Sequence, residues 1–153
     1  DRCLRAGALA MGASVRIVTI PGYLPLVNND VLMDVFQDNA VRLVGGRSFV
    51  RHPDSRNRGG STDMGDLSQI MPAIHPYAGG ATGTSHGVDY MVQDYEKAVI
   101  APAKAMVGTV IDLLSGDATR ASDLLAKSRP NLTKKQYLAL QQSRLSEELY
   151  QGE

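Results

Sequence analysis

The sequence predicts an α/β fold, a mixed sheet flanked by helices, with an α-helical C-terminal tail. β-Branched residues alternate along SVRIVTIPGY, residues 14–23, which is typical of a strand. Apolar residues recur at helical spacing along DVLMDVFQDNAVRLV, residues 30–44, with Asn28 or Asn29 as a possible N-cap and Gly45 as a stop. Segments of these two kinds, alternating along one chain, favour helices packed on a sheet.

Local signals place the remaining elements. Gly12 ends a short helix that begins at Arg2, and Pro102 either kinks a long helix or sits in the first turn of its second part. Thr133 and Gln136 form a capping-box pattern that opens the last helix. The other predicted elements are strands at 48–53 and 73–75, a turn or short helix at 64–71, and helices at 92–114, 115–127 and 133–150.

Composition limits the class of protein. Apolar residues make up 43% and charged residues 21% of the 153 residues, so an ordinary globular core is expected. A formal net charge of zero gives no electrostatic footprint for nucleic acid or an acidic membrane. The sequence has no run of about 18 apolar residues, so no membrane span is expected. The single Cys excludes an internal disulfide framework and fits a reducing compartment, so we expect a cytoplasmic protein.

The stretch GSTDMGDLSQIMPAIHPYAGGATGTSHGVDYMV, residues 60–92, carries two of the three histidines. His86 could ligate a metal, with Asp89 fixing its ring, or could simply bond the backbone of its loop. His75 fits a half-buried structural residue better than a functional one. The chain has no HxxxH, HExxH or CxxC spacing, and a catalytic metal needs about three protein ligands. Residue spacing alone therefore indicates an incomplete site.

The loop that opens this stretch could bind an anion. Residues 59–62, Gly-Gly-Ser-Thr, can present backbone N–H groups and hydroxyls, and Arg56 and Arg58 precede them. This is not a P-loop, and Ser61 lacks the frame of a hydrolase nucleophile. Asp63 and Asp66 could orient a ligand, although a turn or helix cap is the interpretation we favour for them. The four glutamates all lie at or after Glu96, so no general base accompanies the loop.

The order of these segments resembles the C-terminal half of two-metal amidohydrolases and metallopeptidases. This is the group of aminoacylase, carboxypeptidase G and aminobenzoyl-glutamate hydrolase. The resemblance covers about residues 1–115 through GYLPLVNND, GSTDMGD, PAIHPYAGG and SHGVDYMV, and STDMGD and IHPYAGG are most similar to the last branch. It implies the second half of a zinc-peptidase-like catalytic domain at 24–115. The end of a lid or dimerisation domain would lie at 1–23 and a helical C-terminal extension at 116–153.

The resemblance also implies residue roles. His86 matches the family's last metal ligand, whereas His75 stands where many relatives have an apolar residue. The expected substrate-binding residues are Gly60, Ser61, Thr62, Asp63 and His75. A complete site would hold two divalent metals, zinc or manganese, of which this chain supplies one ligand. The other ligands and the catalytic Glu would lie in an N-terminal half, so no catalytic residue is expected here.

The sequence thus predicts a C-terminal fragment of a metal-dependent amidohydrolase acting on N-acyl amino acids or aminobenzoyl-glutamate-like substrates. We expect it to be inactive alone, to need the N-terminal half of the same protein, and to be a homo-oligomer when complete. An uncovered sheet edge would promote association. The alternative is a non-catalytic α/β binding or assembly module of the same ancestry. The tail leucines Leu138, Leu145 and Leu149 could cover the chain's own core or a partner subunit.

Overall fold

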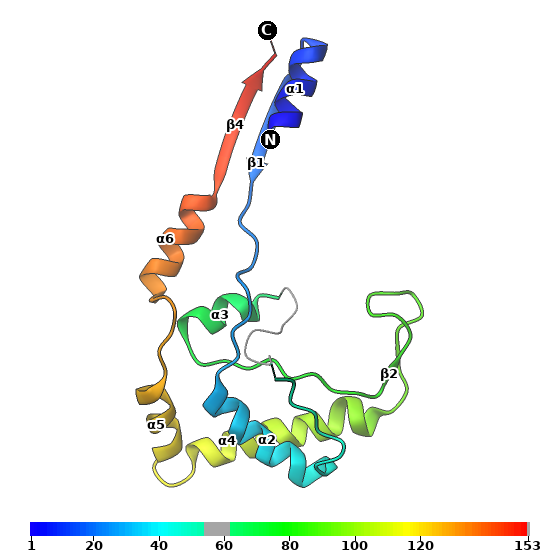
Figure 1. Cartoon of the computed structure of the whole chain (residues 1–153), viewed down its shortest axis with the longest axis vertical. Coiled ribbons are helices and arrows are strands. Elements are labelled where there is room, and N and C mark those ends of the chain that lie inside the picture. Colours follow the sequence, from blue (N-terminus) through cyan, green and yellow to red (C-terminus); the bar gives the residue numbers. More distant parts are fainter. Residues whose placement is uncertain (54–61, 153) are drawn as a thin grey trace. The chain divides into compact units, whose positions relative to one another are not determined.

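The computed structural model describes residues 1–53 and 62–152. Within them, α-helices accompany two small antiparallel sheets, which confirms the predicted α/β class (Figure 1). The chain divides into two compact units. The terminal unit combines Asp1–Tyr23 with Leu132–Glu153, and the central unit is Leu24–Asn131. The resemblance also places a boundary after residue 23, at the end of the lid domain. Whether the two units correspond to the lid and catalytic domains stays a prediction.

The terminal unit contains helices α1 (Arg2–Met11) and α6 (Lys134–Arg144) and strands β1 (Ser14–Thr19) and β4 (Ser146–Gln151). Gly12 ends α1 in the left-handed region at φ 60°, as its position in the sequence predicts. The two strands pair antiparallel, and Ile17, which is buried, lies opposite Glu148. This unit is therefore built from both ends of the chain.

The tail differs from the prediction. Its helix opens at Thr133 with the expected capping box but ends at Arg144, whereas a helix to residue 150 and an entirely α-helical tail were expected. Leu145 adopts an extended conformation, and β4 follows it. A strand forms here because pairing with β1 supplies hydrogen-bond partners to its backbone N–H and C=O groups. In addition, Arg16 of β1 donates to Glu147 of β4 at 2.6 Å.

A two-point ion pair joins α1 to β4. The Arg5 guanidinium donates from Nε to Glu148 Oε1 at 2.7 Å and from Nη2 to Oε2 at 2.5 Å. These hydrogen bonds, more than the accompanying charge attraction, hold the pKa of Glu148 below its ordinary value of 4.5, while desolvation opposes them. The folded state therefore binds fewer protons at Glu148 than the unfolded chain does.

We expect the melting temperature of the terminal unit to fall as the pH drops below about 4.5 through the depressed pKa of Glu148. The stability that this carboxylate contributes is fully present above its unfolded pKa and disappears once the folded protein also protonates it. Glu148→Gln should remove this part of the pH dependence. Circular dichroism melts at several pH values would measure it, with Glu147→Gln as control. If Glu148→Gln leaves the profile unchanged, the ion pair does not carry the effect.

In the central unit, α2 (Asp30–Val44) has the predicted bounds, with the Asn29 side chain accepting a hydrogen bond from Leu32 N. Pro102 lies in the first turn of α4 (Ala101–Leu114), one of its two expected places. The other elements are α3 (Met64–Ile70), β2 (Ala81–Thr82), β3 (Met91–Val92), the π-helical turn η1 (Glu96–Ile100), α4 (Ala101–Leu114) and α5 (Thr119–Lys127).

The strands predicted at 48–53 and 73–75 are absent from the structure. Residues 73–75 make isolated hydrogen bonds in place of strand pairing. The Ala73 carbonyl accepts from Asn29 N at 2.9 Å, and His75 N donates to Asn28 Oδ1 at 2.9 Å. Residues 116–131 belong to the central unit and residues 132–153 to the terminal unit. The C-terminal extension at 116–153 stays a prediction.

The core of the central unit lies between α2 and α4. Phe36 and Ala40 of α2 pack with Ala105 of α4, and Phe49 and Ile74 lie against this cluster. The helices approach closely because the facing residues are small: a Cβ at Gly108 would lie 2.5 Å from Asn39 Oδ1. The buried Asn39 donates to the Val35 carbonyl at 3.0 Å and to Asp112 at 2.8 Å. The interface between these helices is thus partly polar.

Among the described helices, none alone is long and apolar enough to cross a membrane. The segments Glu96–Leu114 and Thr119–Lys127 meet the length and hydropathy criteria only as a pair, and a 90° bend separates them.

Candidate functional site

Polar side chains of α3 hold the connector LPLVNN, residues 24–29, in place. Asp66 accepts a hydrogen bond from Leu24 N at 2.9 Å, and Ser68 accepts one from Val27 N at 3.0 Å. Gln69 donates to the Pro25 carbonyl at 2.6 Å. The Asp66 carboxylate, considered from the sequence as a ligand-orienting group or a cap, therefore anchors the connector.

The backbones of α3 and the connector lie in close contact. Gly65 is buried, and a Cβ at this position would lie 1.9 Å from the Leu24 carbonyl oxygen and 3.4 Å from Leu26 N. Only glycine leaves room for this approach. The start of α3 and the connector are consequently fixed against each other.

His75 lies beside the end of the connector. Its backbone N–H donates to Asn28 Oδ1 at 2.9 Å, and its ring meets Tyr77 edge-on with ring centres 5.4 Å apart. The imidazole Nδ1 is buried and has no hydrogen-bond partner among the described residues. A buried polar atom without a partner carries a free-energy cost that a ligand group can remove. His75 is thus half-buried, as expected, and keeps one polar atom for an interaction.

His86 occupies the loop of a short hairpin. Strands β2 and β3 pair Ala81 with Val92, and His86 is exposed in the loop with φ 63°, in the left-handed region. The carboxylate of Asp89 accepts from Thr84 N, at 3.3 Å to each oxygen, so it shapes the loop rather than orienting the imidazole. The hairpin thus presents the histidine to the outside.

Of the other predicted site residues, some lie within the described part of the chain and some lie outside it. Thr62 accepts a hydrogen bond from Met64 N at 3.4 Å and donates to the exposed Asp63 at 3.0 Å, so both residues belong to the turn that opens α3. Gly60 and Ser61 lie outside the described residues, as do Arg56, Arg58 and Gly59. In the ranges 1–53 and 62–152, no group of three His, Cys, Asp or Glu side chains could hold a metal ion. The substrate-binding and metal-binding assignments remain predictions.

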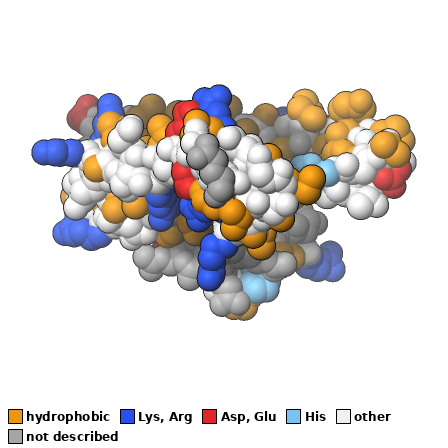
Figure 2. Space-filling view, turned by 90° about the horizontal axis from the view of Figure 1, so that it is seen from above, with side chains coloured by type: hydrophobic (Ala, Val, Ile, Leu, Met, Phe, Trp, Pro, Cys, Tyr) orange, Lys and Arg blue, Asp and Glu red, His pale blue; other side chains and the backbone are white. Residues whose placement is uncertain are grey.

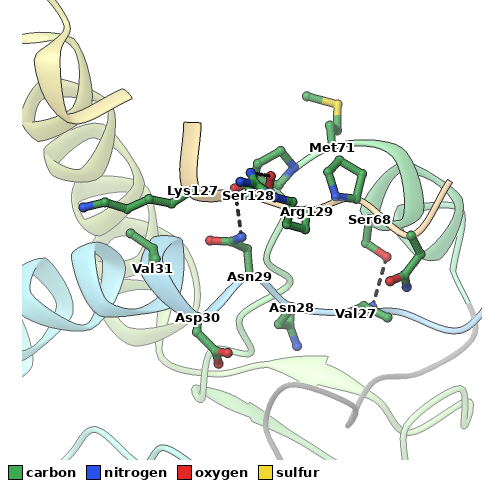
Figure 3. Close-up of a pocket in the computed structure, with 13 residues that line it drawn as sticks. Val27, Asn28, Asn29, Asp30, Val31, Ser68, Met71, Lys127, Ser128 and Arg129 are labelled. Atoms are coloured by element: carbon green, nitrogen blue, oxygen red, sulfur yellow. Dashed lines mark hydrogen bonds between the residues drawn. The ribbon is translucent and has the colours of Figure 1, made fainter. Parts of the chain in front are cut away.

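A cavity of about 310 Å³ lies in the central unit beside the connector (Figure 3). Its walls come from the connector and the start of α2, from Ser68, Met71 and Pro72, and from the end of α5 and the chain that follows it. Asn29 donates to Ser128 at 3.3 Å across one wall, and Arg129 uses its guanidinium on the carbonyls of Ala126 and Ser128. None of the residues predicted to bind substrate or metal lines this cavity.

Sequence reasoning missed the contacts that polar residues make around the connector. Asn28 is buried and holds the His75 backbone, while Ser68 and Gln69 are buried and bond the connector itself. The signal available was the pair of asparagines that closes an otherwise apolar segment. Buried amides need hydrogen-bond partners, and the backbone of a neighbouring segment is a common one.

Comparison with known proteins found sequence similarity to two dipeptidases. The chain is 31% identical over 121 residues to Xaa-Arg dipeptidase of Mus musculus and, over the same length, 31% identical to Xaa-Arg dipeptidase of Homo sapiens. Each match covers 74% of this chain but 28% of the mouse and 27% of the human protein, so the chain spans little more than a quarter of these relatives. No family model matches the chain, and no solved structure matches it significantly.

Proposed function

We propose that this chain is part of a metal-dependent peptidase that hydrolyses the amide bond of a dipeptide or another N-acyl amino acid. The observation that carries the proposal is the similarity to two dipeptidases over 74% of the chain. The relatives' name makes a dipeptide ending in arginine the first substrate to test. An aminobenzoyl-glutamate-like amide is the second, because the STDMGD and IHPYAGG motifs resemble that branch.

His86 is the proposed metal ligand of this chain. An exposed imidazole in a hairpin loop can serve zinc or manganese as one donor among several, and the Asp89 carboxylate bonds the Thr84 backbone and not this ring. Metals bound there would polarise the amide carbonyl and lower the pKa of a bound water. The remaining ligands and the general base would come from the N-terminal half that the family resemblance implies, so this chain alone is expected to be inactive.

His75 and the turn at the start of α3 are the proposed substrate contacts. The buried Nδ1 of His75 can exchange a hydrogen bond with an amide or carboxylate of the substrate. Thr62 and Asp63, with Gly60 and Ser61 before them, would line the same cleft, as the family resemblance implies. The connector and α3 would fix these groups, since both segments are bonded to one another.

The test is the metal content, by mass spectrometry, of the longest native form of the protein, together with its His86→Ala variant. We expect about two divalent ions per chain, fewer in the variant, and a loss of dipeptide hydrolysis of about 100-fold or more. His52→Ala is the matched control, because His52 is also an exposed histidine but has no proposed ligand role. It should keep both metal and activity.

Absence of metal from the native form would reject the peptidase proposal. The alternative would then stand: a binding or assembly module that shares its ancestry with the peptidases. Equal metal content in the His86→Ala and His52→Ala proteins would reject the role of His86 alone.

A further inference from the structure

Helix α4 exposes most of its large apolar side chains. Five of them, spaced along one side of the helix, each expose more than half of their surface: Met106 53%, Val107 59%, Val110 52%, Ile111 57% and Leu114 60%. We call this set the outer face of α4. Figure 2 shows that hydrophobic side chains are also exposed on the face of the molecule that it draws.

The opposite side of the same helix is small or polar. Ala105 and Thr109 are buried, Gly108 touches Asn39, and Asp112 bonds the same asparagine. A surface helix ordinarily turns its large apolar residues toward the core and its polar residues outward. Helix α4 does the reverse within the central unit, so its packing against α2 does not account for its apolar residues.

The outer face is suited to burial. It contains no charged residue, so covering it removes no ion from water. The nearest charges on the helix are engaged elsewhere, because Lys104 pairs with Glu96 at 3.3 Å and Asp112 bonds Asn39. Among the described residues, no large side chain is completely buried, so the central unit has only part of an ordinary core. Apolar patches larger than roughly a few hundred Å² usually mark an interaction surface.

We propose that the outer face of α4 is the surface on which the rest of the complete peptidase packs. This inference rests on the proposed function. A match over 74% of the chain necessarily includes its middle, with nearly all of α4, yet it covers only 27–28% of each relative. The corresponding helix in the relatives thus belongs to a chain several times longer. The occupant is that additional polypeptide, and it would complete the core that α2 and α4 begin.

The experiment uses a chimera in which this chain replaces the matched region of human Xaa-Arg dipeptidase. Val110→Arg places a charge on the outer face, and Val50→Arg makes the same change at an exposed position, 83% accessible, outside it. We expect Val110→Arg to lower the melting temperature of the chimera by about 5 °C or more, and Val50→Arg to leave it unchanged. In the isolated chain, both variants should retain the helicity of the wild type.

The melting temperature of the chimera and the oligomeric state by light scattering can both be measured without metal or activity. These measurements therefore test this inference separately from the peptidase proposal. A folded but inactive chimera that shows the expected difference supports the interface and counts against the function. A chimera that does not fold beside the intact human control, or variants that melt alike, overturns the interface. If the variants melt alike and Val110→Arg dissociates a dimer of the isolated chain, the occupant is a second copy. If it instead abolishes flotation with phosphatidylcholine vesicles, the occupant is a membrane.

Discussion

Replacing Gly65 by alanine is expected to destabilise the central unit by about 3 kcal/mol or more. The added Cβ would lie 1.9 Å from the carbonyl oxygen and 3.1 Å from the carbonyl carbon of Leu24. These are backbone atoms, which cannot rotate away as a flexible side chain can. Within a helix, alanine normally stabilises relative to glycine by about 1 kcal/mol, so the expected effect has the opposite sign from helix propensity.

The damage should spread along the connector. Moving Leu24 away from α3 also strains the hydrogen bonds that Asp66, Ser68 and Gln69 make with this segment. Urea unfolding followed by circular dichroism would measure the loss. Gly46→Ala is the matched control, because no atom lies within 4 Å of its added Cβ, and its effect should stay within about 0.5 kcal/mol. Equal unfolding midpoints for the two variants would contradict the close contact.

Phe36→Ala is expected to cost about 3–5 kcal/mol. Phe36 is the largest member of the buried cluster with Ala40 and Ala105, and its exposed fraction is 8%. Truncation removes the apolar contacts of the ring and leaves a cavity between α2 and α4, whose small facing residues cannot fill it. Total stabilities of domains are about 5–15 kcal/mol, so this single change should remove a large share of the stability of the central unit.

The same urea titration measures this change in the free energy of unfolding. Val50→Ala serves as the control, because that side chain is 83% exposed and its loss should change stability by less than about 0.5 kcal/mol. Indistinguishable midpoints for Phe36→Ala and Val50→Ala would show that the cluster between α2 and α4 does not hold the unit together.

Elements with local signals could be predicted from the sequence. Helix α2 has its expected bounds because Asn29 caps its first turn and glycine follows its last residue. The capping box at Thr133 is confirmed for the same reason. Strand β4 could not be predicted because its stability depends on β1, which lies about as far away as the chain allows: Arg16 and Glu147 are 131 positions apart. The leucine spacing of the tail fits a helix equally well until that partner is known.

The candidate site was predictable in its residue types more than in its contacts. The sequence indicates that His86 lies in a loop, and the structure places it in the hairpin between β2 and β3. It does not indicate that Asp66 would bond Leu24 or that Asn28 would bond His75, because those contacts depend on which backbone groups folding brings near. Side chains with several possible partners, such as Asn and Asp, are therefore assigned only when the fold is known.

The pairing of β1 with β4 sets an order for folding during protein synthesis. Helix α1 and strand β1 leave the ribosome before the central unit, whereas the strand that completes their sheet follows that unit in the sequence. The central unit, by contrast, is a single continuous segment and has all its contacts once residue 131 has emerged. Strand β1 must therefore wait with open hydrogen-bonding groups while the central unit folds. During that interval, chaperones that bind extended segments could bind β1.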